Sequence, residues 1–431
     1  MKQQNKFRKW MGLITLGYVG GVMYTCMYMR SIFYEQMMEA MNVTNTQLGT
    51  LTSYSSTTAL LCVFFGPYLA DKFDAKRVIV FSAGAITVLE FVFMFFVGSF
   101  NVARVLWILQ ALSLCAYWPC LVKYINNLGG EEESGNSFGT YYLVNGLCGA
   151  LGNAVPLWIM NQFGGGLRMA VCTMGVVTLI GTILAVLFLD NEKQMAERGV
   201  FLKGDEPIRV KYVWDVLKWP GTYMLAIAYF TTFTIYTHIS YFNPYLIDVV
   251  GMDPTASSAL SVVRQYGAMV VAPIGGIMAD KVFKSSSKWF IVAFTISALM
   301  LAVPIFFTSE TNPVFVMIYS VLPSLVIFAL YSVTYSILRE LHISPIVAGT
   351  AIGIATKAST LSNMLLPPLF GKWLDQYGNE GYKFIFMLLI ANCAVGILDC
   401  FWVRSHDKKC IAGKRVMKIG SAALAAEEKA Q

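Results

Sequence analysis

The stretches GPYLADKFDAKR, residues 66 to 77, and GGIMADKVFKSSSK, residues 275 to 288, share one pattern. Each follows an apolar run and reads Gly-x-x-x-Ala-Asp-Lys, with further basic residues after it. Asp71 and Asp280 are 209 residues apart, which is close to half of the 431-residue chain. A loop that recurs at this distance indicates two corresponding halves and a chain built by internal duplication.

The residue types of this repeated loop suit the inner end of a membrane-spanning helix. A glycine lets two helix ends approach closely. An aspartate can accept hydrogen bonds from the amides at a neighbouring helix N-terminus, where the helix dipole favours an anion. The basic residues fit the level of the lipid headgroups, and a merely solvated turn is the alternative. The expected gating motif comprises Gly66, Asp71, Lys72, Arg77, Gly276, Asp280 and Lys281.

The composition indicates a membrane protein. Hydrophobic residues make up 56% of the chain and charged residues 13%, whereas a soluble domain carries about 25% charged residues. We predict an all-α polytopic protein with twelve transmembrane helices in two pseudo-symmetric six-helix bundles. The apolar stretches that are long enough to cross a bilayer lie at about 11–38, 48–70, 78–99, 103–124, 137–160, 168–189, 221–248, 257–279, 288–308, 312–337, 348–370 and 384–404.

One long polar segment, DNEKQMAERGVFLKGDEPIRVKY, divides the chain. The expected parts are an N-terminal six-helix bundle at 1–189, a cytoplasmic linker at 190–220, a C-terminal six-helix bundle at 221–405 and a cytoplasmic tail at 406–431. With the N-terminus in the cytoplasm, 25 of the 32 Lys and Arg residues fall on inner segments. This asymmetry predicts that both termini are cytoplasmic. It also places the net charge of +7 beside anionic lipid, so the expected partner is the bilayer and not nucleic acid.

The cysteines and the N-terminal segment have structural interpretations. Most of the nine cysteines lie inside expected spans, where a thiol behaves as a small apolar group. No CxxC pair or His/Cys cluster predicts a metal, and we expect no cofactor. The N-terminal sequence MKQQNKFRKW runs into a span too long for a signal peptide, so none is expected. We expect a monomer.

The paired loops resemble the signature that the major facilitator superfamily carries between helices 2 and 3 and again between helices 8 and 9. Twelve spans, their division into six and six, and the long central linker extend this resemblance over nearly the whole chain. The resemblance implies the major facilitator fold, in which spans 1, 4, 5, 8 and 11 line a central cavity and span 3 is peripheral.

Three stretches are also similar to the organophosphate:phosphate antiporter branch of that superfamily. They are QALSLCAYWPCLVKYINNL at residues 110–128, VAGTAIGIATKAS at the start of span 11, and YMRSIF in span 1. In that branch the span 1 arginine binds the substrate phosphate, and Arg30 occupies the matching position. The chain departs from the branch where Tyr236 replaces a second clamp arginine and Gly149 replaces a histidine.

Arg30 is one of three basic residues inside the expected spans. A charge there costs several kcal/mol unless it faces a partner, a cavity or the bilayer surface. Arg30 lies in the outer half of span 1, and Tyr24, Tyr28 and Tyr34 surround it at near-helical spacing. Its guanidinium suits a carboxylate, sulfonate or phosphate because it donates two parallel hydrogen bonds. Snorkelling to the outer interface is the alternative.

Arg264 and Lys357 are the other two basic residues. Arg264 precedes Asp280 by sixteen residues, about 24 Å along span 8 from its inner end. A ligand or gating role and a pairing with an outer acid such as Asp248 are both open. Lys357 lies near the middle of span 11, where snorkelling is hardest. Its ammonium could bind an anion or take part in coupling.

Two residues are candidates for ion coupling. Glu90, in the middle of span 3, is either a protonated residue packed against a neighbour or a carrier of the coupling proton. His238 in span 7 is next to position 239, the mate of Arg30 at the repeat offset. Histidine titrates near neutral pH, so a protonatable or substrate-binding role stands beside a structural one. The coupling ion is left open among proton, sodium and counter-anion.

Trp118 and Asn145 fall on the expected cavity-lining spans 4 and 5, where helix packing and substrate contact are both open. The candidate substrate-binding residues are therefore Arg30, Lys357, Arg264, His238, Tyr28, Tyr236, Trp118 and Asn145.

These features predict a secondary active transporter of the cytoplasmic (inner) membrane of a bacterium. The expected solute is a small organic anion, such as a sugar acid, carboxylate, sulfonate or organophosphate, moved by alternating access. Three intramembrane cations favour an anionic solute, and no Walker motif points to ATP. A transporter-like sensor of such a solute is the alternative, because part of the phosphate clamp is missing. No enzyme is expected, because no nucleophile elbow, zinc motif or carboxylate pair is present.

Overall fold

The computed structural model describes residues 2–62, 65–129, 134–197, 213–308 and 310–417. Helices and connecting turns make up this part of the chain, and no strand occurs in it. The helices form two compact units. Unit 1 contains Met1–Asp205, Asp253–Tyr266 and Pro367–Lys372, and unit 2 contains Glu206–Met252, Gly267–Leu366 and Trp373–Gln431.

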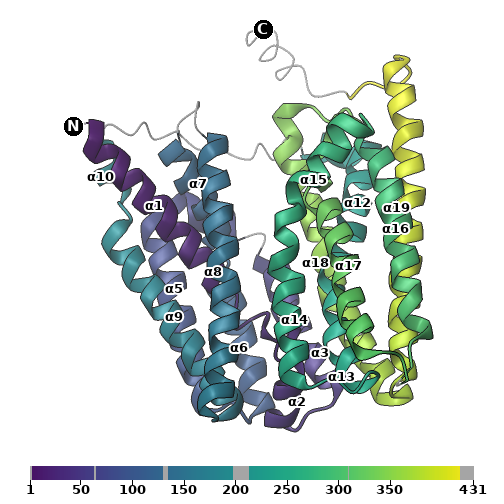
Figure 1. Cartoon of the computed structure of the whole chain (residues 1–431). Helices are drawn as coiled ribbons and strands as arrows, with labels where there is room; N and C mark the ends of the chain where they lie inside the picture. The colour runs from purple at the N-terminus through teal and green to yellow at the C-terminus, as the bar shows by residue number, and fades with distance from the viewer. Residues whose placement is uncertain (1, 63–64, 130–133, 198–212, 309, 418–431) are drawn as a thin grey trace. The chain divides into compact units, whose positions relative to one another are not determined.

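Unit 1 is drawn in purple to blue-teal, with the green α14, in Figure 1. In it α1 packs most extensively against α8, and α5 against α9. Its helices are α1 (Lys2–Val22), η1 (Met29–Ser31), α2 (Tyr34–Met41), α3 (Asn45–Leu61), α4 (Gly66–Lys72), α5 (Ala75–Phe95), α6 (Phe100–Ser113), α7 (Tyr117–Gly129), α8 (Ser134–Phe163), α9 (Gly166–Phe188), α10 (Glu192–Glu197) and, from the second half of the chain, α14 (Pro254–Tyr266).

Unit 2 is drawn in teal (α12) through green to yellow in Figure 1. In it α16 packs most extensively against α19, followed by α12 against α19. Its helices are α11 (Val213–Lys218), α12 (Pro220–His238), η4 (Ile239–Tyr241), α13 (Phe242–Asp248), η5 (Gly267–Val271), α15 (Ala272–Ile277), the π-helical turn η6 (Met278–Val282), α16 (Ser286–Ala302), η7 (Val303–Phe306), α17 (Pro313–Tyr331), η8 (Thr334–Arg339), α18 (Pro345–Tyr377), of which Pro367–Lys372 belong to unit 1, and α19 (Glu380–Ile411).

Glycines bring α1 and α8 close together in unit 1. A Cβ built on Gly21 would lie 2.6 Å from the carbonyl oxygen of Asn145, and one built on Gly17 would lie 2.6 Å from Cβ of Val144. Real Cβ atoms do not approach other heavy atoms so closely, so any larger residue at either position would push the helices apart. Small residues serve the same purpose in helix pairs within membranes, where close backbone packing is a main source of association.

Eight helices of the described residues are long and apolar enough to cross a membrane. The other four of the twelve predicted spans contain α1, α3 with α4, α12 and α18. In the first of these the helix is interrupted, α3 has only 17 residues, and hydroxyl side chains lower the hydropathy of α12 and α18. In α12, for example, Thr231, Thr232 and Thr234 each return a hydrogen bond to a carbonyl of their own helix. The eight candidate spans are Ala75–Phe95, Phe100–Leu128, Ser137–Phe163, Gly166–Phe188, Pro254–Val282, Ser286–Phe306, Pro313–Arg339 and Glu380–Ile411.

The first span of each half is broken at a corresponding place. The α-helix α1 ends at Val22, and the chain continues through irregular turns to α2. Backbone hydrogen bonds in these turns alternate between three-residue and four-residue spacing, from Thr25 N to Val22 O (3.2 Å) and from Phe33 N to Met29 O (2.8 Å), for example. In the second half α12 ends at His238 and is followed by η4 and α13. We call residues 23–33 the α1 break.

Candidate functional site

Arg30 lies in the α1 break and is buried, with 7% of its surface exposed. Its Cζ atom stands 5.9 Å from the centre of the Tyr34 ring, in a cation–π contact. The Tyr34 hydroxyl in turn donates to Oδ1 of Asn45 at the start of α3 (2.7 Å), which fixes the ring. The buried guanidinium is therefore positioned by an anchored aromatic side chain.

Further aromatic side chains precede this arginine in the α1 break. Tyr24 stacks on Tyr28 with ring centres 6.0 Å apart, and its edge meets Tyr117 of α7 at 6.2 Å. Tyr28 is 42% exposed, so one face of this group is open. Of the three tyrosines predicted around Arg30, Tyr34 is in contact with the guanidinium, while Tyr24 and Tyr28 stack on one another and meet Tyr117 of α7.

Asn145 belongs to a polar cluster beside the same wall. Its Nδ2 donates to the Tyr141 hydroxyl (3.2 Å). A Cβ built on Gly20 would lie 2.5 Å from the Tyr141 hydroxyl, 2.7 Å from Nδ2 of Asn145 and 3.2 Å from the Tyr117 hydroxyl. Three polar groups from α7 and α8 thus converge on a bare stretch of α1 backbone, which only glycine leaves room for.

Arg264 is buried at the end of α14, with 3% of its surface exposed, and it donates from NH2 to Ser261 Oγ (2.6 Å). One turn back, Ser258 Oγ accepts a bond from Nε2 of Gln36 on α2 (3.4 Å). Arg30 precedes Gln36 by six residues, and Arg264 follows Ser258 by six. Arg264 therefore lies about 9 Å along α14 from this contact. Arg30 lies six residues before the contact, across η1 and the start of α2, and both arginines belong to unit 1.

His238 and Tyr236 lie in unit 2. His238 is fully buried, and its Nδ1 is 2.9 Å from the carbonyl oxygen of Thr234, one turn back in α12. Tyr236 stacks flat on Tyr331 of α17, with ring centres 4.2 Å apart and an interplanar angle of 3°. The position where the antiporter branch carries its second clamp arginine is therefore part of an aromatic stack.

That stack extends over α12, α17 and η8, and it was not predicted from the sequence. Tyr229 pairs with Tyr335 at 4.9 Å and shares a hydrogen bond with the Tyr331 hydroxyl (3.3 Å). A spacing of four and then three residues along α12, and of three and then four along α17 and η8, was the available signal. The members of the stack are Tyr229, Phe233, Tyr236, Phe328, Tyr331 and Tyr335.

Two of the remaining candidates, Lys357 and Trp118, are less buried than Arg30 and His238. Lys357 is half-buried on α18 in unit 2, and Trp118 on α7 in unit 1 is 46% exposed. Arg30, Arg264, Tyr28, Trp118 and Asn145 thus lie in unit 1, while His238, Tyr236 and Lys357 lie in unit 2. Glu90 lies in the middle of α5 in unit 1 and is fully buried.

The first copy of the repeated loop has an aspartate cap, provided by Asp74. Its carboxylate accepts hydrogen bonds from the backbone N–H of Arg77 at the start of α5 (3.2 Å) and from that of Glu192 at the start of α10 (2.8 Å). Gly66 packs against the Cys115 carbonyl, 2.4 Å from where its Cβ would stand. The ammonium of Lys72 lies over the Tyr68 ring (5.8 Å). The side chain of Asp71 lies outside the described residues.

In the second copy the partner of the aspartate differs from the one that the sequence predicts. Asp280 lies in the π-helical turn η6, and its Oδ1 accepts from Arg339 NH2 (2.6 Å) rather than from helix-end amides. Gly275, and not Gly276, makes the close approach, because a Cβ at position 275 would lie 2.0 Å from the Ala329 carbonyl oxygen. Lys281 is exposed beside it.

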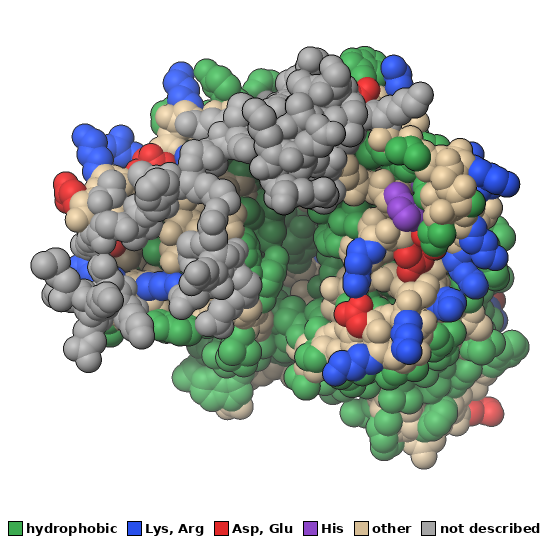
Figure 2. Space-filling model, turned by 90° about the horizontal axis from the view of Figure 1, so that it is seen from above, with side chains coloured by type: hydrophobic (Ala, Val, Ile, Leu, Met, Phe, Trp, Pro, Cys, Tyr) green, Lys and Arg blue, Asp and Glu red, His purple; other side chains and the backbone are tan. Residues whose placement is uncertain are grey.

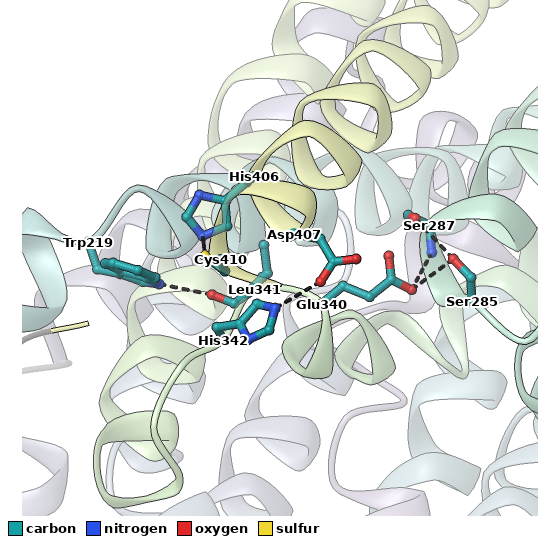
Figure 3. Close-up of polar contacts among 9 residues, drawn as sticks. All are labelled: Trp219, Ser285, Ser287, Glu340, Leu341, His342, His406, Asp407 and Cys410. Carbon is teal, nitrogen blue, oxygen red and sulfur yellow. Dashed lines mark hydrogen bonds and ion pairs between the residues drawn. The ribbon is translucent and has the colours of Figure 1, made fainter. Parts of the chain in front are cut away.

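Polar contacts tie four segments together at this end of unit 2. Figure 3 shows Glu340 accepting bonds from the Ser285 hydroxyl (3.0 Å) and the Ser287 amide (3.1 Å) at the start of α16. The Trp219 indole donates to the Leu341 carbonyl (2.9 Å). His342 bonds to Asp407 near the end of α19 (2.8 Å), and His406 is in contact with Cys410 (3.4 Å). Basic side chains gather around this end of the unit, with acidic ones among them (Figure 2).

Comparison with known proteins agrees with this fold. The model of the Major Facilitator Superfamily matches residues 16–362 and 225–418. Inner membrane protein YihN of Escherichia coli is 26% identical over 426 residues, which cover 97% of this chain and 99% of that protein. A protein of Cupriavidus necator named as a probable sulfoacetate transporter, SauU, is 24% identical over 391 residues, covering 85% of this chain and 86% of that protein.

Solved structures are similar in fold. The crystal structure of the nucleoside transporter NupG superimposes with a TM-score of 0.73 at 11% identity, covering 92% of this chain and 98% of that one. Among the described residues, no cluster of three or more His, Cys, Asp or Glu side chains is placed to hold a metal ion. The all-α fold, the multi-pass character and the inner-membrane relatives agree with the match over most of the chain, and the chain belongs to the major facilitator superfamily of membrane transporters.

Proposed function

We propose that this protein is a secondary transporter for a small organic anion, which it binds at Arg30 and moves by alternating access. The observation that supports this most directly is the burial of Arg30 in the α1 break. A buried guanidinium inside a membrane span is costly unless it faces a partner, a cavity or the bilayer surface. The Tyr34 ring holds this guanidinium in one place. Arg264, also in unit 1, supplies a second buried cation.

A carboxylate or a sulfonate is the anionic group that we favour. The second clamp arginine of the organophosphate:phosphate antiporter branch is absent, and Tyr236 stacks on Tyr331 at that position. A singly charged group is well matched by one bidentate guanidinium, whereas a doubly charged phosphate gains from two. The name of the SauU relative, a probable sulfoacetate transporter, points to the same class of solute.

Sulfoacetate is therefore the first probe, and glycerol 3-phosphate is its phosphate counterpart. Binding of each is measured by calorimetry on the purified protein in detergent. We expect tighter binding of sulfoacetate. Loss of Arg30 should cost about 2–5 kcal/mol, because a charge-assisted contact is removed. Arg30→Lys keeps the charge without the two-pronged geometry and should lie between the wild type and Arg30→Ala.

Arg104 is a matched control. Its Cζ stands over the Tyr54 ring at 5.9 Å, the same distance as that of Arg30 from Tyr34. Arg104→Ala should leave affinity unchanged. Equal affinity in Arg30→Ala and the wild type would show that Arg30 is an interfacial anchor.

Transport and sensing are separated by uptake into proteoliposomes. A transporter exchanges labelled sulfoacetate for internal sulfoacetate through many turnovers. A sensor of the same fold binds the compound in detergent and exchanges almost none.

A further inference from the structure

Glu90 is a buried acid whose carboxyl oxygens have no hydrogen-bond partner among the described residues. It lies in the middle of α5 with none of its surface exposed, and neither carboxyl oxygen makes a hydrogen bond in the described part of the structure. An ionised carboxylate in such a place would have lost its water without any compensating contact. Such a site favours the neutral, protonated form of the carboxyl group.

The surroundings of Glu90 contain polar groups but no charge. The helices packed against α5 are α9, α6 and α7. The neighbours that interact with the Glu90 carboxyl are the Thr178 side chain on α9 and the titratable Cys26 thiol in the α1 break. Those three helices carry Arg168, Arg104 and Lys123, and none of the three is among the groups that act on the Glu90 carboxyl. No cation is thus in place to hold the ionised form where Glu90 now lies.

The same neighbours connect Glu90 to the segment that carries Arg30. Gln110 of α6 donates from Nε2 to the Cys26 sulfur (3.4 Å). One turn away on α6, the Trp107 indole donates to the Met27 carbonyl (3.1 Å). Arg30 follows Cys26 by four residues. An ionised Glu90 needs water or a hydrogen-bond donor, and the packing that would have to open to admit either includes Cys26 of the α1 break.

We infer that Glu90 carries the coupling proton of this transporter, and that its neighbour Cys26 links the proton to the Arg30 segment. This rests on the proposed function. The Glu90 carboxyl gives its proton to water on the side of lower proton concentration and becomes a carboxylate. It takes one back from water on the other side. One proton therefore crosses with each anion, in the same direction.

The test is carried out in proteoliposomes with labelled sulfoacetate and the membrane potential clamped at zero. One proton per solute then sustains about a tenfold accumulation for each pH unit of gradient, since one unit is a tenfold ratio. Glu90→Gln resembles the protonated acid in size and charge. It should abolish the accumulation driven by the pH gradient, while exchange of internal for external sulfoacetate persists.

Asp399→Asn is the matched control. Asp399 of α19 is also buried, and both of its carboxyl oxygens lack a hydrogen-bond partner among the described residues, but it belongs to unit 2, whereas the α1 break belongs to unit 1. The Asp399→Asn variant should accumulate sulfoacetate like the wild type. Undiminished accumulation in Glu90→Gln, or its loss in Asp399→Asn alone, overturns the inference. A wild type that neither exchanges nor accumulates sulfoacetate contradicts the proposed function instead.

A second measurement needs no solute. In the infrared spectrum of the wild type at neutral pH, a protonated carboxylic acid gives its own carbonyl band. The part of that band that comes from Glu90 should be absent from the spectrum of Glu90→Gln. It should remain in the spectrum of Asp399→Asn. Identical spectra of the wild type and Glu90→Gln in this region would show that Glu90 holds no proton, and would overturn the inference.

Discussion

The ring of Tyr266 lies directly against Gly149, so that a Cβ at position 149 would stand 2.7 Å from Cε1 of the tyrosine and 3.2 Å from its hydroxyl oxygen. The tyrosine comes from α14 and the glycine from α8, and both belong to unit 1. The Tyr266 hydroxyl also accepts a hydrogen bond from Nδ2 of Asn153 (2.8 Å). This contact explains why a residue larger than glycine, such as the histidine of the antiporter branch, does not fit here.

Gly149→Ala should therefore lower the thermal stability of the protein, by about 1–3 kcal/mol if the ring cannot shift. The same substitution in a Tyr266→Ala background should cost much less, because the clash is gone; a double-mutant cycle of melting temperatures measures the difference. Gly139→Ala, on the same helix but facing open space, is the control and should not destabilise. Equal losses from Gly149→Ala in both backgrounds would refute the contact.

The two acidic side chains beside the second repeated loop should differ in their effect on stability. Asp280 and Arg339 are more than half exposed, and an exposed ion pair contributes at most about 1 kcal/mol. Glu340 is more enclosed and accepts two bonds at the start of α16, where loss of a cap costs about 0.5–2 kcal/mol. Glu340→Ala should therefore lower the melting temperature more than Asp280→Ala does.

Asp280→Ala should instead affect the rate of transport. If the Asp280–Arg339 pair acts at a gate, the exchange of sulfoacetate slows while its affinity in detergent is kept. Lost affinity with an unchanged exchange rate would contradict a gating role.

Orientation in the membrane follows from the basic residues and can be tested across one helix. Gln162 is exposed at the end of α8, and Lys193 is exposed on α10; α9 separates them. In a background whose native thiols are blocked, Gln162→Cys should react with a membrane-impermeant reagent added outside intact cells. Lys193→Cys should react only after the cells are opened. The reverse pattern would invert the topology.

The sequence predicts the helices and their duplication well, because hydropathy and the repeated loop are local signals. The same local signals place Arg30 inside the first span. It does not predict the α1 break, since residues 23–33 contain neither Gly nor Pro. The break depends on distant contacts, such as that of Trp107 with the Met27 carbonyl. The partner of Asp280 was missed likewise, because Arg339 follows it by 59 residues.

A proline kink is permanent, because its ring and its missing N–H forbid a straight helix. The α1 break contains no proline. Each of its residues retains a backbone N–H, and one indole hydrogen bond from α6 opposes the return of a regular turn at Met27. The backbone of the first span can therefore form one continuous α-helix. Straightening it would rotate Arg30 about the helix axis, so that the arginine could turn from one face of the span to another without any change in the rest of α1.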